Sequence, residues 1–186
     1  MLKKAVAVVM VLLAAVLGYA ATLPATFHVQ RAARIQAPPE RVFALIDDFH
    51  AWGAWSPWEK IDPALQRSYS GAPSGEGAAY AWEGNRNIGK GRMRIVESDP
   101  PSRIAIELDF LEPFEAHNTA VFTLVGEGDA TDVTWAMDGE NTYLSKLIGL
   151  FFDMDGMIGG NFETGLANLK AEAEESDAKP PAPGGA

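Results

Sequence analysis

The sequence predicts an α+β fold, in which a curled antiparallel sheet of about six or seven strands wraps around one long C-terminal helix. From residue 26 onward, apolar and polar residues alternate in short runs that are typical of strands. After Gly139 the apolar period becomes helical and remains so to about residue 170. Only one long helix is available to cover the apolar face of the sheet, so the sheet has to curl around it. Such an arrangement leaves a cavity between sheet and helix.

The N-terminal segment, residues 1–25, is predicted to be a transmembrane anchor or a signal segment. Residues 5–23 carry no charge, and about 19 helical residues at about 1.5 Å each roughly span the hydrocarbon core of a bilayer. Lys3 and Lys4 precede this run, and the next basic residue is Arg31. This asymmetry places the N-terminus in the cytoplasm and the remaining chain on the extracytoplasmic, periplasmic side.

A cleaved signal peptide is the alternative, with the small residues around Gly18 and Ala20 as a cleavage site. The apolar run is longer than the roughly 7–15 residues of a usual signal core, which favours the anchor. Both interpretations export the domain: it is membrane-anchored in the first and secreted in the second.

The first strand is expected over residues 26–35, with Phe27, Val29 and Ile35 facing inward. Two short helices should follow it. Pro39 and Glu40 suit a first helical turn, and that helix should end near residue 48. The next stretch contains three tryptophans spaced by three residues, which predict an aromatic lid over one end of the core or the mouth of an apolar pocket: Trp52, Trp55 and Trp58.

Alternation then predicts the remaining strands, separated by turns rich in glycine and proline. The clearest pattern lies in residues 104–110, where every second residue is apolar, as in a strand with one wet face. The inward positions are Tyr80 and Trp82, then Met93 and Ile95, then Ile104, Ile106, Leu108 and Phe110, and finally Val133, Trp135 and Met137.

The closing helix is predicted to run from Tyr143 to about Ala173 as one apolar stripe that includes Phe152. Five glycines lie within it, and each costs about 1 kcal/mol relative to alanine in a helix interior. They predict close packing against the sheet or room for a ligand, with a kink near Gly159 and Gly160. Residues 174–186 are charged and then rich in proline and glycine, which predicts a disordered tail.

Composition excludes several classes of function. The chain has no cysteine, so it has neither disulfides nor a thiolate site or nucleophile. Of its 15 lysines and arginines, two precede the apolar run, which leaves 13 against 25 acidic residues and no basic stripe for nucleic acid. The three histidines lack the spacing of metal ligands, so neither a metal nor a cofactor is expected.

Several segments together resemble the SRPBCC (START-like, helix-grip) superfamily, in its polyketide cyclase/dehydrase branch. The segments that carry the resemblance are Ala37–Phe43, Trp55–Trp58, Gly77–Asn85, Gly91–Ser98 and Asn161–Lys170. The resemblance covers residues 26–173 and implies the helix-grip fold for that domain. It does not fix an activity, because the superfamily includes lipid carriers, cyclases, hydroxylase domains and chaperone activators.

Catalytic residues are not identified by any motif, so an enzyme is less expected than a binding protein. Asp153 and Asp155 are two residues apart on the predicted helix and do not share a face. One of them, or Glu83, is a candidate buried acid for acid–base work. Glu83, His117 and Asn118 lie near strand ends and are expected to meet at the cavity mouth.

The predicted function is therefore binding of an apolar small molecule or lipid in the internal cavity of a membrane-anchored domain. The alternatives are a cyclase- or hydrolase-like enzyme with an apolar or aromatic substrate, or a protein-interaction domain that uses exposed tryptophans of the lid. The cavity-lining candidates are Trp52, Trp55, Trp58, Tyr80, Trp82, Ile106, Phe110, Trp135, Met137 and Phe152.

Overall fold

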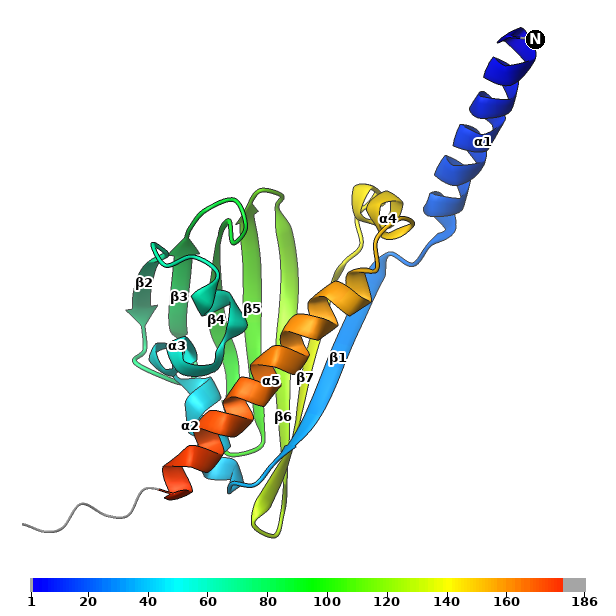
Figure 1. The fold of residues 1–186 in the computed structure, drawn as a ribbon. Helices are drawn as coiled ribbons and strands as arrows, with labels where there is room; N and C mark the ends of the chain where they lie inside the picture. The colour runs from blue at the N-terminus through cyan, green and yellow to red at the C-terminus, as the bar shows by residue number, and fades with distance from the viewer. Residues whose placement is uncertain (1, 179–186) are drawn as a thin grey trace, which may run out of the picture.

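The structure, a computed structural model, describes residues 2–178 (Figure 1). Its helical elements are α1 (Leu2–Thr22), α2 (Pro39–Asp47), η1 (Phe49–Ala51), α3 (Trp52–Trp55), η2 (Pro57–Lys60), α4 (Tyr143–Gly149) and α5 (Met154–Ala178). Its strands are β1 (Thr26–Ile35), β2 (Gln66–Gly71), β3 (Ala78–Glu83), β4 (Lys90–Asp99), β5 (Arg103–Glu112), β6 (Ala116–Glu127) and β7 (Ala130–Glu140).

The strands form one antiparallel sheet of seven strands in the order β1-β7-β6-β5-β4-β3-β2. The sheet curls, and α5 lies across its concave face with α2 and α3 near the lower end (Figure 1). Strands β2 to β7 follow one another as a meander, whereas β1 pairs with β7 at the far edge. The predicted α+β fold, with a curled sheet, a long C-terminal helix and short helices after the first strand, is confirmed.

Alternation along the strands determines which side chains face α5. In β5, Ile104 and Ile106 are buried on the concave face, whereas Glu107, which follows Ile106, is exposed. The same period in β7 buries Val133, Trp135 and Met137. Burial of these large apolar side chains on one face is the main force that curls the sheet around the helix.

Strand β2 is an element that the sequence pattern did not indicate. All six of its residues are exposed, so no alternation of burial could be expected from it. It forms the edge of the sheet, and its pairing with β3 comes from backbone hydrogen bonds in register, with Tyr69 opposite Tyr80.

The predicted closing helix is in fact two helices, because the chain breaks between α4 and α5 at residues 150–153 and not near Gly159 and Gly160. Both helices have a side-chain cap. The Thr142 hydroxyl accepts from the Ser145 N–H at 3.2 Å, and Asp153 Oδ1 accepts from the Gly156 N–H at 2.9 Å.

The C-terminal prediction also needs correction. Helix α5 continues to Ala178, so residues 174–178, which were expected to be disordered, are helical. An ion pair supports this part of the helix, since Lys170 Nζ lies 3.3 Å from the carboxylate of Glu174, and Glu174 also accepts from the Gln36 N–H. The remainder of the predicted tail, residues 179–186, lies outside the described residues.

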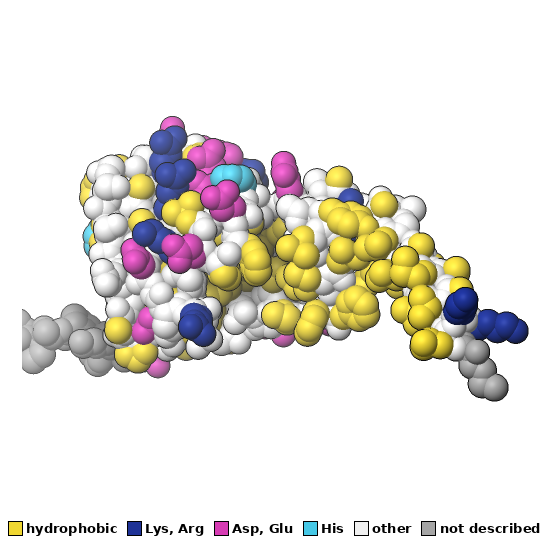
Figure 2. Space-filling view, turned by 90° about the horizontal axis from the view of Figure 1, so that it is seen from above, with side chains coloured by type: hydrophobic (Ala, Val, Ile, Leu, Met, Phe, Trp, Pro, Cys, Tyr) yellow, Lys and Arg dark blue, Asp and Glu magenta, His cyan; other side chains and the backbone are white. Residues whose placement is uncertain are grey.

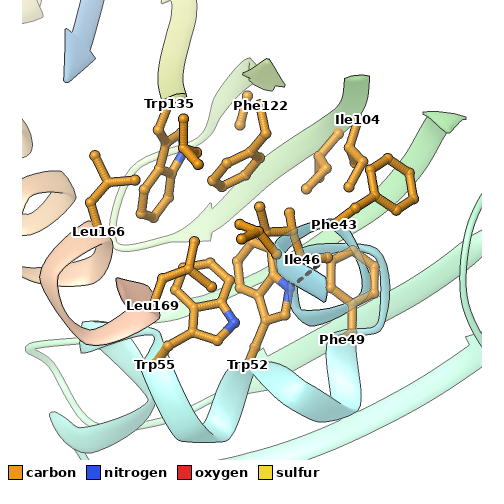
Figure 3. Packing of buried hydrophobic residues seen from close by; sticks show 14 of the residues in the cluster. Phe43, Ile46, Phe49, Trp52, Trp55, Ile104, Phe122, Trp135, Leu166 and Leu169 are labelled. Atoms are coloured by element: carbon orange, nitrogen blue, oxygen red, sulfur yellow. Dashed lines mark hydrogen bonds between the residues drawn. The ribbon is translucent and has the colours of Figure 1, made fainter. Parts of the chain in front are cut away.

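The core lies between the sheet, α5 and the helices that follow β1. Figure 3 shows Trp52 and Trp55 from the α3 region packed toward Phe122 and Trp135 of the sheet, with Leu166 and Leu169 of α5 beside them. Trp135 also stacks on Phe162 of α5, with ring centroids 4.2 Å apart and planes within 7°. This end of the fold is therefore solidly filled.

Helix α1 extends away from the domain as an exposed apolar rod (Figure 1). The helix is long and apolar enough to cross a membrane, and a signal sequence would have the same properties. The end of α1 nearest the domain contacts α4, where the Tyr143 hydroxyl donates to the Leu17 carbonyl at 2.9 Å.

Candidate ligand cavity

A cavity of about 610 Å³ lies between the concave face of the sheet and the first part of α5. Its lining reaches the linker between α1 and β1 at Leu23 and Pro24, the β3–β4 turn at Ile88, and α4 at Lys146. Because β1 begins and β7 ends at this end of the sheet, the cavity lies toward the same end as α1 and α4. The opposite end is closed by the packed core.

Eight of the ten predicted lining residues are on the cavity wall: Trp52, Trp58, Tyr80, Trp82, Ile106, Phe110, Trp135 and Met137. They come from the lid and from β3, β5 and β7, whose inward positions converge when the sheet curls. Further apolar lining residues, which were not proposed as site residues, include Val29, Leu108, Ala120, Ile158 and Phe162. The cavity therefore presents mainly aromatic and aliphatic surface.

Two of the predicted lining residues do not reach the cavity. Trp55 is fully buried in the core, where its Nε1 donates to the Leu45 carbonyl at 2.9 Å and its ring packs edge-on against Phe122 and Trp135. Phe152 is 60% exposed in the turn between α4 and α5. The helical period that placed Phe152 inward does not apply there, since the helix is interrupted at that residue.

The tryptophans form a buried lid and not an exposed hot spot. Trp52 Nε1 donates to the Ile46 carbonyl at 2.9 Å, and Trp55 Nε1 donates to the Leu45 carbonyl. Both carbonyls lie in the last turn of α2, where they lack a partner within the helix. Trp58 is partly buried and meets Trp135 edge-on at 5.6 Å between ring centroids. The alternative that used these side chains as an exposed protein-binding surface is therefore wrong for Trp52 and Trp55.

One wall of the cavity contains a buried carboxylate, Glu59, that the sequence analysis did not single out. Its side chain is 7% exposed and accepts from the Tyr80 hydroxyl at 2.5 Å and from Arg67 Nε at 2.6 Å. Burial, and then the hydrogen bond to Glu59, raise the pKa of Tyr80 far above its usual range. The protonated Tyr80 hydroxyl and the Arg67 guanidinium both donate to the Glu59 carboxylate, so the three side chains form a charge-assisted hydrogen-bonded wall.

A second charged group joins β1 to α5. Arg31 lies on the inward face of β1 and donates from Nη2 to Asp155 at 2.9 Å and from Nε to Glu163 at 2.8 Å. Gly159 makes room for it, because a Cβ added there would collide with the guanidinium. The hydrogen bond from Arg31 lowers the pKa of Asp155, so this cavity-lining carboxylate is ionised at neutral pH and is poorly suited to act as a general acid.

The other acid–base candidates lie away from the cavity. Asp153 caps α5, and Glu83 is exposed and paired with Lys90 at 2.9 Å. His117 is on the convex face, where its Nδ1 lies 2.7 Å from Asp109, whereas Asn118 lines the cavity. The prediction that Glu83, His117 and Asn118 meet at the mouth is wrong, because adjacent residues of one strand face opposite sides.

Two polar atoms of the cavity-lining residues are buried without a hydrogen-bond partner in the described part of the chain: Asn118 Oδ1 and Trp135 Nε1. Leaving a buried polar atom without a hydrogen bond costs folding free energy. A ligand that forms a hydrogen bond with either atom would remove this cost. Within residues 2–178, no group of three histidine, aspartate or glutamate side chains is arranged to hold a metal ion.

The solved structures that resemble this chain share its fold at low sequence identity. Protein CV1439 from Chromobacterium violaceum is 19% identical, with a TM-score of 0.56 over 81% of this chain and 99% of its own. A protein from Nitrosospira multiformis is also 19% identical, with a TM-score of 0.60 over 82% and 100%. The di-domain ARO/CYC protein BexL from the BE-7585A biosynthetic pathway is 16% identical, with a TM-score of 0.60 over 83% of this chain and 52% of its own.

Among curated protein sequences, none matches the chain significantly. The family model described as "Polyketide cyclase / dehydrase and lipid transport" matches residues 26–174, which is the whole domain from the start of β1 to near the end of α5. The match agrees with the helix-grip architecture and with the resemblance noted in the sequence. The chain therefore belongs to the polyketide cyclase / dehydrase and lipid transport family.

Proposed function

We propose that this protein binds an apolar small molecule or lipid in the cavity between the sheet and α5, and that α1 holds the domain at the extracytoplasmic face of a membrane. The observation that carries the first part is the cavity itself, whose volume of about 610 Å³ suits a small ligand and whose lining is mainly aromatic and aliphatic. The family name, which includes lipid transport, supports the same class of ligand.

A catalytic function receives less support from the site. BexL, named as an ARO/CYC protein, has the same fold, but at 16% identity this resemblance concerns the fold alone. Two of the carboxylates that line the cavity wall are engaged by neighbouring side chains: Glu59 by Tyr80 and Arg67, and Asp155 by Arg31. Both serve as parts of the wall, which favours binding over acid–base chemistry.

The membrane placement is supported by the sequence of α1 and the charges around it. Helix α1 has two lysines before its apolar run and no acidic residue, which favours a cytoplasmic N-terminus. The domain that follows carries a strong excess of acidic side chains, so attraction to anionic lipid is not what would hold it there.

The cavity function can be tested with a pair of substitutions on one strand. Ala120 lines the cavity, and Thr119 beside it on β6 is exposed on the convex face. We expect Ala120→Phe to fill part of the cavity and to lower binding of a fluorescent fatty acid at least about tenfold, whereas Thr119→Phe leaves binding unchanged. Titration of the full-length protein in detergent measures both.

Native mass spectrometry of the purified full-length protein gives an independent measurement. We expect apolar ligand mass, either retained from the host or taken up from a lipid mixture, on the wild type and on Thr119→Phe but not on Ala120→Phe. Absence of ligand from the wild type under both conditions would contradict the proposed function.

A further inference from the structure

We infer that the exposed apolar surface formed by α4 and the turn after it lies in the interface of the bilayer that holds α1, so that the cavity receives its ligand directly from the membrane. The inference rests on the proposed function for the cavity and for α1, and it adds a docking surface and a source for the ligand. Throughout, "apolar rim" denotes five residues of this surface together with Met157 from the first turn of α5: Tyr143, Leu144, Ile148, Phe151, Phe152 and Met157.

The length of the linker places this surface at the membrane. Helix α1 ends at Thr22 and β1 begins at Thr26, so residues 23–25 are the whole connection. Three extended residues reach only about 10 Å. A domain joined to a membrane-spanning helix by so short a segment cannot leave the interface, and the end of the sheet where β1 begins must face the lipid.

The apolar rim lies at that same end of the sheet, because α4 follows directly after β7, whose last residues pair with the first residues of β1. Its side chains are unusually exposed for their type: Phe151 is 74%, Phe152 60% and Met157 60% accessible. Exposed apolar residues that cluster on one surface mark a contact with another apolar phase or partner, whereas scattered ones do not.

Figure 2 shows the continuity of this surface. Seen from above, hydrophobic side chains extend without interruption from the middle of the domain to α1, while the charged side chains gather on the part of the domain away from α1. The contact between α1 and α4, including the hydrogen bond from the Tyr143 hydroxyl to Leu17, joins the apolar rim to the anchor. The bilayer that surrounds α1 is therefore the occupant that this geometry favours.

One further exposed aromatic residue supports the same orientation from across the cavity. The turn between β5 and β6 carries Phe114, which is 68% exposed, and β6 begins at the end of the sheet where β7 finishes. Cavity-lining residues Phe110 and Ala116 flank this turn. Apolar side chains thus stand on both sides of the cavity at its membrane-facing end.

This arrangement determines the class of ligand. Leu23 and Pro24 of the linker, Gly149 of α4 and Met154 of α5 all line the cavity, so the cavity wall is continuous with the segments that carry the apolar rim. A ligand that enters here leaves the bilayer without crossing water, which suits a molecule that dissolves in the membrane, such as one with an acyl or isoprenoid chain.

Position-specific labelling of the full-length protein tests the docking. The chain has no cysteine, so Phe151→Cys creates one labelling site for an environment-sensitive NBD fluorophore. In phosphatidylcholine nanodiscs, we expect strong quenching of this label by nitroxide-labelled lipid and protection from aqueous iodide. The matched control is Asp129→Cys, on the exposed β6–β7 turn at the opposite end of the sheet, which should give the reverse result.

Equal lipid quenching at the two positions, or iodide access at residue 151 as high as at residue 129, would overturn the inference. Protection from iodide without lipid quenching would also overturn it, because the rim would then be covered by a protein. The docking should be insensitive to salt, since it depends on apolar contact and the domain is strongly acidic.

The source of the ligand is tested with the double variant Phe151→Asp, Phe152→Asp. Both side chains are exposed, so their replacement should not disturb the core. Energy transfer from the cavity tryptophans to an anthroyloxy-labelled fatty acid measures its entry. We expect uptake from nanodisc lipid to slow at least about tenfold, with equilibrium binding from detergent solution unchanged.

An unchanged rate of uptake from the bilayer would overturn the membrane route. If the wild type shows no energy transfer from either source, the proposed cavity function fails, whereas the docking is still decided by the quenching of the Phe151→Cys label. The two failures are therefore distinguishable.

Discussion

Charged side chains near the cavity stabilise its walls through their hydrogen bonds and ion pairs. Glu59 is almost fully buried, yet it receives one neutral and one charged donor, and this compensates for its removal from water. Arg31 performs a similar role between β1 and α5, where it bonds Asp155 and Glu163. The cavity can thus remain largely apolar inside while its walls are held in position by polar contacts at the edges.

On the convex face, His117 and Asp109 provide a prediction about pH. The hydrogen bond to Asp109 raises the pKa of His117 above its ordinary 6.5, and the same contact, with help from Arg92, lowers the pKa of Asp109. We expect a pKa above 6.5 for His117 when the full-length protein in detergent is titrated by NMR, and a fall in that value in Asp109→Asn.

His28 supplies the control, since its pKa is raised by a different carboxylate, Asp138. Asp109→Asn should leave the pKa of His28 unchanged, and Asp138→Asn should lower the pKa of His28 without changing that of His117. Because the folded-state pKa of His117 is raised, the pair stabilises the fold below the unfolded value of 6.5 and loses this contribution as the pH rises through the folded value. If the pKa of His117 does not change in Asp109→Asn, the observed hydrogen bond between the two side chains is contradicted.

Most of the apolar cavity wall was predictable from the sequence, because period-two alternation assigns strand residues to a face. The same alternation places Arg31 on the inward face of β1 together with Phe27 and Val29. Nothing comparable pointed to Glu59, which lies in a short irregular helix with no periodic pattern. Its two side-chain partners lie on β2 and β3, and no sequence pattern shows that these strands pack beside it.

At the scale of elements, the glycines of α5 differ in what they do. A Cβ at Gly165 would approach Trp135 Cζ3 at 2.8 Å and Pro57 Cδ at 3.2 Å, both in rigid rings. A Cβ at Gly160, in the same helix, would have nothing within 4 Å. Gly165 therefore allows α5 to approach the sheet closely, whereas Gly160 has no such role.

This difference predicts opposite effects of the same substitution. Gly160→Ala should stabilise the protein by up to about 1 kcal/mol, the gain in helix propensity. Gly165→Ala should destabilise it by about 1–3 kcal/mol, because overpacking against Trp135 exceeds that gain. Urea unfolding of the full-length protein in detergent, followed by circular dichroism, measures both; a stabilising Gly165→Ala would show that the helix can move away at little cost.

Element boundaries were less predictable than element types. The apolar residues on both sides of the α4–α5 break continue one helical stripe, so the sequence pattern predicts a single helix across residues 150–153. The break is marked by the C-cap of α4 at Leu150 and by Asp153, whose side chain caps the first turn of α5 and so begins a new helix. Strand β2 was missed for the opposite reason, since an exposed edge strand has no buried face to produce a pattern.

For the whole molecule, retention of α1 decides between the anchored and the secreted form. We expect the protein to stay in the membrane fraction after alkaline carbonate extraction and to keep its N-terminal residues when the mature form is sequenced. The physical reason is that the apolar run is long enough to span the bilayer. A mature N-terminus near residue 20, with the protein in the soluble fraction, would contradict the anchor.

The cavity is a property of the whole molecule that could be inferred before any contact was known. One helix cannot fill a seven-stranded curled sheet, and the lid and α2 fill only the end opposite the linker. The sequence does not indicate at which end of the sheet the cavity lies. That position depends on the pairing of β1 with β7, which brings the linker and α4 to the same end.

The three-residue connection between α1 and β1 also limits where this protein can deliver anything. A soluble carrier diffuses between two membranes, but if α1 spans a bilayer as proposed, the domain stays within about 10 Å of that bilayer and cannot move to another. The proposed ligand would then be returned to the same leaflet, presented in place, or passed to a second protein that comes to it. Under the proposed anchoring, the short linker therefore restricts ligand exchange to partners that the protein meets in the plane of one membrane.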